Sequence, residues 1–171
     1  MKKDIERVEL PEKMLIIIRG LPSSGKSTLA KLLLLGGGET ICSDDYMTTP
    51  DGEYHFSRSG FVEAHRLCQQ DCEALMQGAV SPIILHNNMG EAWEAEVYFK
   101  LATSYGYSTM VLNLYDSGLN DSELCARSLH GMPQHLIQKV RQKWDIDIYP
   151  HRQRSSPPPN SSVLRPQRFH S

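Results

Sequence analysis

Met14-Leu-Ile-Ile-Ile-Arg-Gly20-Leu-Pro-Ser-Ser-Gly25-Lys26-Ser27-Thr28 is the stretch that decides the fold, because it fits the spacing G-x-x-x-x-G-K-[ST] at every fixed position. Residues 14–19 form a short, apolar, β-branched run that is typical of a buried parallel strand. Residues 27–35 have the composition of a helix, and three glycines after them end it. A strand, a glycine-rich loop and a helix in this order predict a phosphate-binding loop.

The residue types in this loop suit a bound nucleotide. Gly20 and Gly25 let the backbone turn so that successive N–H groups and the helix N-terminus hold phosphate oxygens. Lys26 is expected to reach the β- and γ-phosphates, and the Ser27 hydroxyl is expected to ligate Mg²⁺. We therefore expect ATP and Mg²⁺ as cofactors. The predicted nucleotide contacts are Gly20, Ser23, Ser24, Gly25, Lys26, Ser27 and Thr28.

Length and composition predict one domain with its own core, since the chain has 171 residues of which 40% are hydrophobic. No apolar run approaches the ~20 residues that span a bilayer. The first seven residues contain no apolar stretch after their lysines, unlike a signal peptide. We therefore expect a cytoplasmic or nuclear protein without a membrane partner.

The four cysteines do not predict a metal site. Cys68 and Cys72 are four residues apart on an expected helix, with His65 on the same face, but no fourth ligand is evident. None of the cysteines forms a C-x-x-C pair, so buried reduced thiols are the favoured interpretation.

Charge divides the chain into an acidic body and a basic tail. Residues 151–171 contain four arginines and no acidic residue, whereas residues 1–150 contain fourteen basic and twenty acidic side chains. An acidic body disfavours long nucleic-acid substrates unless a local basic groove exists.

Apolar patterns alternate between strands and helices along the chain. Strands are expected near 39–43, 82–86 and 107–114, and helices over 57–77, 91–105, 121–131 and from 133 onward. Phe61 and Trp93 are assigned to the inner faces of their helices. The alternation predicts an α/β fold: a P-loop parallel sheet flanked by helices, with a C-terminal helical lid.

Three segments are predicted from this pattern. Residues 1–12 form an N-terminal extension, 13–149 the P-loop kinase-like domain, and 150–171 a disordered tail rich in Pro, Ser and Arg. Residues 157–159 are prolines that could bind a protein partner as a polyproline helix, and a plain disordered terminus is the alternative.

The remaining site residues follow from the rule that ligands bind beyond the carboxyl ends of parallel strands. This rule groups the loop with Asp44, Asp45, His86, Asn87 and Asn88. A carboxylate there can take a proton from an attacking hydroxyl or hold Mg²⁺ through water. Asp44 is the favoured catalytic base, and a helix or turn cap is its alternative role.

The predicted lid is expected to supply a positively charged side chain that stabilises the transferred phosphate. Arg127 is the candidate clamp, with a solvated helix charge as the alternative. His130 and His135 could touch phosphates or be plain surface groups. Arg141 and Lys143 are assigned to a solvated face.

Five segments together resemble the Nedd-four-binding-protein-two-like family, whose P-loop domain is similar to polynucleotide 5′-kinases. They are residues 15–30, Ser43-Asp-Asp-Tyr46, Ser81-Pro-Ile-Ile84, Ala92-Trp-Glu94 and Arg127-Ser-Leu-His-Gly-Met-Pro133. The resemblance covers residues 13–145 and implies ATP-dependent transfer to a 5′-hydroxyl. It implies that Asp44 is the general base, that Lys26 and Ser27 are the phosphate-loop pair, and that Arg127 is the lid arginine.

The chain departs from the family pattern at three positions. His86 replaces the aspartate that usually ends the third strand, and Met47 replaces an arginine that holds the acceptor phosphate in polynucleotide kinases. Gln134 replaces an arginine after the Gly-x-Pro turn. These departures alter the expected acceptor-binding site more than the expected ATP-binding site.

Three functions remain open at this stage. The chain could be a kinase acting on a nucleic-acid 5′-end, or a kinase acting on a small metabolite, which the acidic body and Met47 favour. It could also be a degenerate nucleotide-binding domain that acts as a protein-interaction module, which His86 and the basic tail favour.

Overall fold

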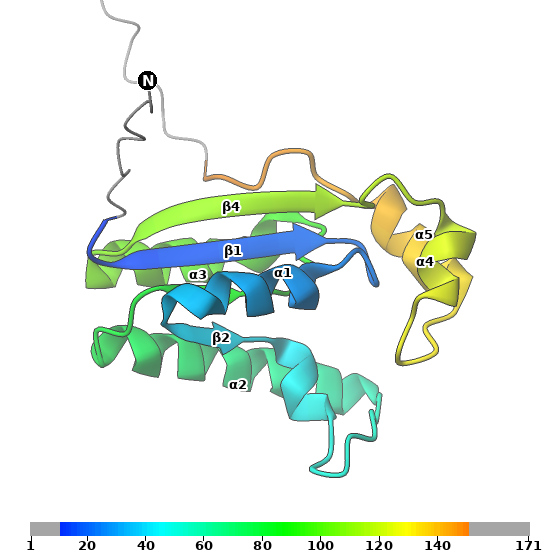
Figure 1. Ribbon diagram of the computed structural model, residues 1–171, viewed down its shortest axis with the longest axis horizontal. Coiled ribbons are helices and arrows are strands. Elements are labelled where there is room, and N and C mark those ends of the chain that lie inside the picture. The colour runs from blue at the N-terminus through cyan, green and yellow to red at the C-terminus, as the bar shows by residue number, and fades with distance from the viewer. Residues whose placement is uncertain (1–10, 151–171) are drawn as a thin grey trace, which may run out of the picture.

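A four-stranded parallel sheet lies at the centre of the computed structural model, which describes residues 11–150. Its strands are β1 (Met14–Gly20), β2 (Glu39–Ile41), β3 (Ile83–Leu85) and β4 (Ser108–Tyr115), in the order β2-β3-β1-β4. The strands run in one direction, and their carboxyl ends meet at one edge (Figure 1). The predicted α/β class is confirmed.

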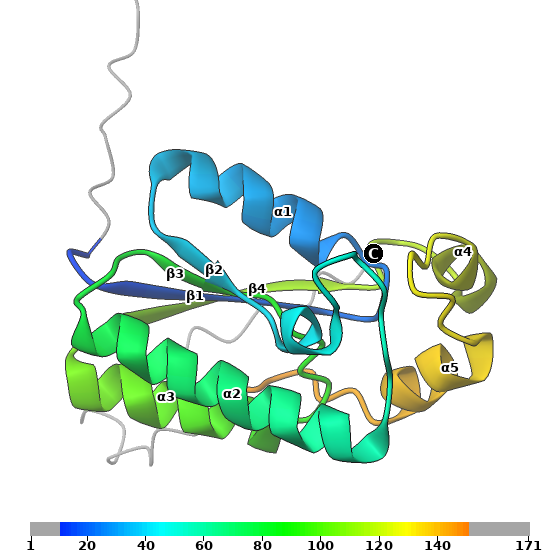
Figure 2. The same cartoon turned by 90° about the horizontal axis from the view of Figure 1, so that it is seen from below.

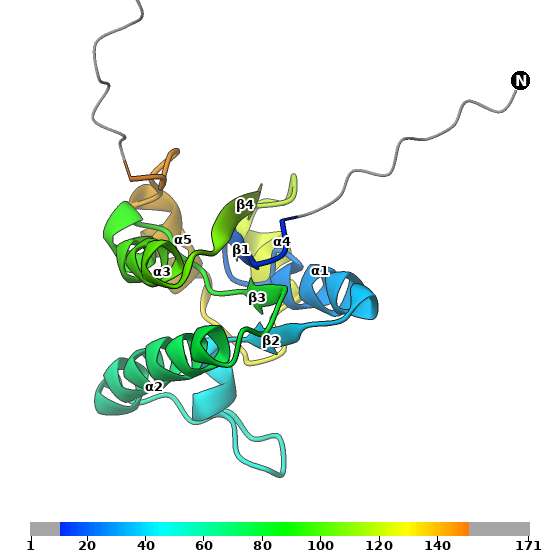
Figure 3. The same ribbon diagram turned by 90° about the vertical axis from the view of Figure 1, so that its left-hand side faces the viewer.

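Helices cover both faces of this sheet. Helix α1 (Lys26–Leu33), which continues into the 3₁₀ turn η1 (Leu34–Gly36), lies on one face, and α2 (Arg58–Gln77) and α3 (Ala92–Tyr105) lie on the other (Figures 2 and 3). The 3₁₀ helix η2 (Ser43–Met47) follows β2. Helices α4 (Asp121–Ala126) and α5 (Gln134–Gln142) lie beyond the carboxyl ends of β1 and β4 (Figure 1). We call residues 121–142 the lid.

The central strand β1 divides the core in two. All seven of its residues are buried. Leu15 and Ile17 pack in the cluster that includes α2 and α3, whereas Ile16 and Ile18 pack in the cluster that includes α1. Side chains alternate between the faces of a strand, so the continuous apolar run is explained by burial on both sides.

Local capping sets the helix boundaries. The Ser57 hydroxyl accepts the Gly60 backbone N–H at 3.0 Å, so α2 begins at the predicted position, and Gly78 caps its other end. At the start of α4, Asn120 and Glu123 each accept the backbone N–H of the other, at 3.0 and 2.8 Å.

Two inner-face assignments are wrong. Trp93 is 68% exposed, because α3 buries the stripe formed by Ala95, Tyr98, Phe99 and Ala102. Trp93 lies two residues before Ala95, a rotation of about 200° that places it on the opposite side of the helix. Phe61 is 41% exposed and contacts other aromatic rings in the first turn of α2.

The two predicted terminal segments lie outside the described residues, apart from residues 11, 12 and 150. The same is true of the proposed proline-rich contact at residues 157–159. Among the helices of residues 11–150, none combines the length and the apolar character that crossing a bilayer requires.

Candidate functional site

The phosphate-binding loop has the backbone geometry that its glycines predict. Gly25 adopts φ 100° as it leads into α1, and Ser23 adopts a positive φ of 65°. A Cβ at Gly20 would lie 2.3 Å from Ser24 Oγ and 3.2 Å from the Tyr115 carbonyl oxygen, so a larger residue there would force the loop to shift. Ser24 Oγ is itself buried and has no hydrogen-bond partner within the described chain. A strained loop with an unsatisfied buried hydroxyl is suited to a ligand that supplies the missing contacts.

Lys26 extends back along this loop. Its Nζ donates hydrogen bonds to the carbonyl oxygens of Gly20 and Leu21, at 3.1 and 2.9 Å. Burial lowers the pKa of Lys26 to about 8, and the neighbouring Asp44 charge opposes this decrease. The ammonium is therefore mostly protonated at neutral pH and held where the loop turns. Asp44 follows β2, whose carboxyl end lies at the same edge of the parallel sheet as this loop.

The end of β3 holds the turn that carries Asp44 and Asp45. Asn87 Oδ1 accepts hydrogen bonds from the Ser43 backbone N–H at 2.9 Å and from the Ser43 hydroxyl at 3.1 Å. Asn87 and Ser43 are both buried, whereas Asp44 and Asp45 are exposed at the start of η2. Asn87 therefore holds the start of the turn in place through Ser43. Asn88 contributes its backbone oxygen, which accepts the Gly20 N–H at 3.2 Å.

His86 lies next to this acidic turn. Its backbone N–H bonds the Ile41 carbonyl at 3.1 Å, its side chain is buried, and its Nδ1 has no partner among residues 11–150. Burial lowers the pKa of His86, and Asp45 opposes that decrease. Asp45 is exposed as a residue, but its carboxyl is partly desolvated, which raises its pKa, and His86 opposes that increase. A neutral imidazole therefore faces a carboxylate beside Lys26.

The donor atoms at this edge fit Mg²⁺ held together with a nucleotide. Mg²⁺ is typically bound by one or two carboxylates and by substrate phosphates rather than by a complete protein cage. The exposed Ser27 hydroxyl and Asp44 or Asp45 would be its protein ligands. Residues 11–150 contain no group of three His, Cys, Asp or Glu side chains placed to hold a metal ion by themselves. Cys68 and Cys72 are buried free thiols, as expected.

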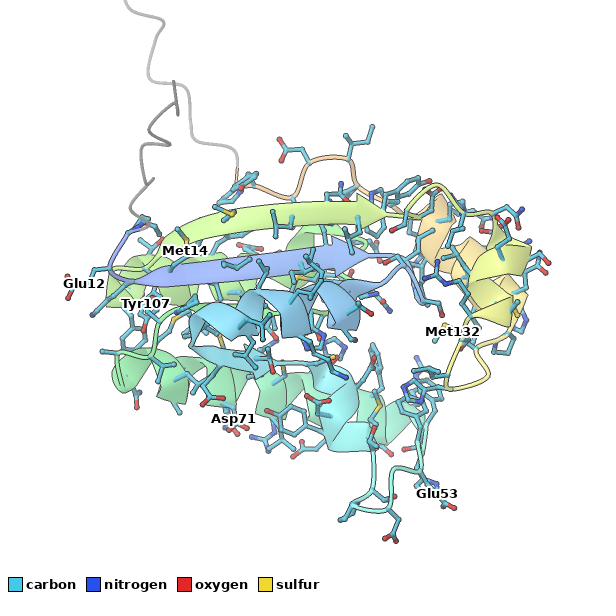
Figure 4. The ribbon with its side chains drawn as sticks, in the orientation of Figure 1. Glu12, Met14, Glu53, Asp71, Tyr107 and Met132 are labelled. Atoms are coloured by element: carbon cyan, nitrogen blue, oxygen red, sulfur yellow. The ribbon has the colours of Figure 1, made fainter. Side chains whose placement is uncertain are left out.

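The lid contacts the loop that follows the acidic turn through a pair of stacked rings. The rings of His130 and Tyr54 stack with centroids 4.5 Å apart and an interplanar angle of 27°. Burial, and then the Asp44 charge, raises the pKa of Tyr54 to about 12. Tyr54 pairs with Thr48, whose hydroxyl donates to the Asp44 backbone carbonyl at 2.9 Å, so the stack lies beside the acidic turn. Figure 4 shows the lid loop, marked by Met132, on the same side of the molecule as the loop marked by Glu53.

Arg127 and His135 are both exposed on this lid. Arg127 follows the last residue of α4, and its backbone N–H bonds the Glu123 carbonyl at 3.1 Å. His135 lies in the first turn of α5. Helix α4 ends at Ala126 and not near Gly131 as expected, so Arg127 lies on the segment between the two lid helices. Its role as a clamp stays a prediction.

Arg141 corrects the expectation of a solvated face. Its guanidinium donates to Asp116 at 2.6 Å, to Asp121 at 2.8 Å and to the Leu119 carbonyl at 3.2 Å. The hydrogen bond from Arg141 lowers the pKa of Asp116. These contacts tie α5 to the start of α4 and to the end of β4. Lys143, by contrast, is 69% exposed, as expected.

Arg19 is a structural residue that the sequence reasoning missed. It is buried at the end of β1, and its guanidinium donates to the carbonyls of Met89, Gly90 and Asp145. It also lies 3.9 Å from the centre of the Trp144 ring. A charged residue inside a run of apolar strand residues was the available signal. Arg19 joins the sheet to the segment after α5.

Comparison with known proteins agrees with this geometry. No protein-family model matches the sequence. The chain is 34% identical over 138 residues to uncharacterized protein PM0531 of Pasteurella multocida (strain Pm70), which covers 73% of this chain and 77% of that protein. It is 31% identical over 131 residues to NEDD4-binding protein 2 of Homo sapiens, which covers 74% of this chain and 7% of that protein.

A third relative is the 2′,3′-cyclic-nucleotide 3′-phosphodiesterase of Mus musculus, 31% identical over 103 residues, or 58% of this chain and 23% of the enzyme. The chain thus spans less than a tenth of the human relative and about a quarter of the mouse relative. These matches and the site geometry indicate a nucleotide-related P-loop protein.

Two solved structures share the fold. A chain of the Pnkp1/Rnl/Hen1 RNA repair complex matches with a TM-score of 0.61 and 18% identity, over 81% of this chain and 45% of that one. A candidate kinase from Chloroflexus aurantiacus matches with a TM-score of 0.57 and 18% identity, over 81% and 80%. At this identity they establish the architecture, a P-loop kinase-like fold.

Proposed function

The chain belongs to the NEDD4-binding-protein-2-like family of P-loop kinase-like proteins, and on this premise we propose that it binds ATP with Mg²⁺ and transfers the γ-phosphoryl group to a hydroxyl acceptor. The observation that carries the proposal is the phosphate-binding loop after β1, with its buried, unpartnered Ser24 hydroxyl and Lys26 folded along it, at the same sheet edge as the turn after β2 that carries Asp44. A cation for the phosphates and a base for the acceptor are thereby close together.

Each residue then has a defined task. The loop N–H groups and Lys26 hold the β- and γ-phosphates of ATP. Asp44 accepts the proton of the acceptor hydroxyl while the oxygen of that hydroxyl bonds to the γ-phosphorus. The bond from that phosphorus to the β–γ bridging oxygen breaks, and ADP leaves with the electron pair. Arg127 on the lid balances the charge on the transferred group. Bound Mg²⁺ supplies further positive charge at the phosphates.

The class of hydroxyl acceptor has two candidates. A nucleic-acid 5′-end is suggested by the resemblance to polynucleotide kinases. A small hydroxyl compound is favoured by the acidic body and by Met47, which is buried and carries no charge toward an acceptor phosphate.

A second proposal is that the domain binds nucleotide and acts through a protein partner. Its motivating observation is His86, an imidazole where the related pattern has a carboxylate for Mg²⁺. NEDD4-binding protein 2 is, by its name, a partner of NEDD4. The Pro-rich segment at residues 157–159 would be the contact region in this chain.

The experiment that separates these proposals is an ATP-turnover assay on the full chain with Mg²⁺. Turnover is measured without an acceptor and with either 5′-hydroxyl oligonucleotides or small hydroxyl compounds. Acceptor-stimulated ADP release together with a phosphorylated product supports the kinase. ATP binding without product formation at any acceptor supports the binding module. The Asp44→Asn variant serves as the control for contaminating kinases.

A further inference from the structure

An exposed group of aromatic rings lies beside the acidic turn. We call Tyr54, Phe56, Phe61, His65 and His130 the aromatic patch. Phe56 and Phe61 are 6.1 Å apart between ring centroids, and Phe61 and His65 are 4.4 Å apart. Phe56 is 66% and Phe61 is 41% exposed. Large apolar rings left in contact with water next to a polar site are typical of a binding surface.

The patch lies beside the turn that carries Asp44. Burial raises the pKa of Tyr54, and the Asp44 carboxylate raises it further. Burial lowers the pKa of His65, and the same carboxylate opposes that decrease. Tyr54 pairs with Thr48, and the Thr48 hydroxyl donates to the Asp44 backbone carbonyl at 2.9 Å, which places the Tyr54 ring beside the turn that carries Asp44. The rings therefore adjoin the group proposed as the base.

The electrostatics around the patch disfavour a polyanion. Residues 43–71 contain six acidic side chains and only two basic ones, Arg58 and Arg66. The Arg66 guanidinium is already paired with Glu63 on the same helix. Met47 is buried and uncharged at the position where the related pattern has an arginine. Nucleic-acid chains bind through several phosphate contacts to Lys and Arg, and residues 43–71, which supply four of the five rings, lack such a row of cations.

We propose, building on the kinase function above, that the acceptor is a free nucleoside. Its neutral, planar base stacks on the aromatic patch, and its 5′-hydroxyl is presented to Asp44. Base–aromatic stacking needs no charge and tolerates different bases, because every base has a π-face. The hydroxyl proton passes to Asp44, the hydroxyl oxygen bonds to the γ-phosphorus of ATP, and ADP leaves. The product is a nucleoside 5′-monophosphate.

The patch suits a nucleoside better than a bound peptide or an oligonucleotide. A peptide would account for exposed rings, but it gives no reason for their position beside the acidic turn. An oligonucleotide would use the rings, but each additional phosphate would meet the acidic turn. A nucleoside has the ring and the hydroxyl, and it has no phosphate before transfer.

The first test compares acceptors on the full chain. Adenosine, guanosine, cytidine and uridine are compared with a ten-nucleotide 5′-hydroxyl RNA, at low and at physiological salt. We expect a nucleoside to be phosphorylated with a KM at least about tenfold below that of the RNA and with little salt dependence. Preference for the RNA, with affinity that falls steeply as salt increases, would overturn the inference and leave the kinase proposal standing.

The second test changes the rings. Phe61→Ala is expected to raise the nucleoside KM by about ten- to one-hundredfold, the range for loss of one stacking contact, with kcat changed less than about threefold. Tyr54→Ala should also raise the KM, whereas Tyr54→Phe, which keeps the ring, should have the KM of the wild type. Val62→Ala is the matched control, because Val62 is 66% exposed beside Phe61 and makes none of these ring contacts. A KM unchanged in both alanine variants contradicts a stacking role.

A binding measurement keeps the inference testable without turnover. Nucleoside binding to the wild-type chain, saturated with a non-hydrolysable ATP analogue, is measured by calorimetry and repeated with Phe61→Ala. Nucleoside bound by the wild type and lost in the variant supports the patch even if transfer is slow. If the analogue binds but no nucleoside does, the inference is wrong. If Asp44-dependent transfer occurs only to acceptors without a ring, it is wrong as well, whereas the kinase function is retained.

Discussion

Asn87 Oδ1 accepts the backbone N–H of Ser43 at 2.9 Å, so the ends of β3 and β2 are joined directly before Asp44. Asn87 Nδ2 in turn lies 3.7 Å from Cys68 Sγ on α2, and both side chains are buried. The position of the proposed base is therefore determined by a side chain from a neighbouring strand and not by its own short 3₁₀ helix alone.

Replacing this anchor should misplace the base. Asn87→Leu removes the acceptor and leaves the Ser43 N–H buried without a partner, which costs ~1–3 kcal/mol of folding stability. We expect transfer to fall by about ten- to one-hundredfold with ATP affinity nearly unchanged, because misplacement of a catalytic group by ~1 Å has effects of that size. Ser43→Ala is the control, since it removes only the hydroxyl contact. Equal transfer rates in Asn87→Leu and wild type would show that the turn keeps its conformation without the Asn87 hydrogen bond.

Nucleotide affinity should decline at alkaline pH. Burial lowers the pKa of Lys26 to about 8, so the free protein loses this positive charge as the pH rises through that value. Bound phosphates favour the protonated form, and the affinity for ATP should therefore be nearly constant from pH 7 to about 7.5 and then fall about tenfold per pH unit well above 8. The measurement is a binding titration with a fluorescent ATP analogue. Lys26→Arg, which stays charged, should show no such decline, and a decline of equal size in that variant would assign it to another group.

Removing Arg19 should destabilise the fold. Its guanidinium satisfies three buried or half-buried carbonyls and stacks on Trp144. Arg19→Met keeps the apolar stem but leaves those carbonyls unsatisfied, and we expect a loss of about 3 kcal/mol in the free energy of unfolding. Urea denaturation monitored by tryptophan fluorescence measures it. Lys143→Met, on the exposed side of the same region, should change stability by less than ~0.5 kcal/mol. Similar midpoints for the two variants would contradict the account of Arg19.

His86 should weaken the affinity of the site for Mg²⁺. A neutral imidazole is a poor ligand for this hard cation, which prefers oxygen. His86→Asp is therefore expected to lower the Mg²⁺ concentration needed for half-maximal turnover and to raise transfer, while binding of metal-free nucleotide does not improve. His86→Asn is the control, because it removes the ring without adding charge. If wild-type turnover already saturates at sub-millimolar Mg²⁺ and the aspartate variant is no better, Asp44 or Asp45 supplies the carboxylate.

Local sequence signals predicted the fold well. The loop after β1 is set by a spacing of glycine, lysine and serine, and β1 is set by a continuous apolar run, so neither depends on distant residues. The start of α2 was readable from Ser57, whose hydroxyl caps the helix. The group of residues at the carboxyl ends of the strands followed from topology, because parallel strands bring those ends to one edge.

Contacts between segments distant in sequence were not predictable in this way. Arg141 has the composition of a solvated helix face, and only the fold brings Asp116 and Asp121 within its reach. Trp93 was assigned to the core on hydrophobicity, whereas the packing of α3 against the sheet selects a different stripe. The stacking of His130 on Tyr54 joins residues 76 positions apart, and no pattern in either segment indicates the other.

The most direct test of the account is the transfer rate of Asp44→Asn. The substitution removes the proposed base and keeps the size of the side chain, so ATP affinity should stay within about threefold of wild type. Acceptor phosphorylation, measured with labelled ATP under saturating nucleotide and Mg²⁺, should fall by ~10²–10⁴-fold, the usual contribution of a general base. Transfer within a few-fold of wild type would contradict the assignment of Asp44 and with it the proposed mechanism.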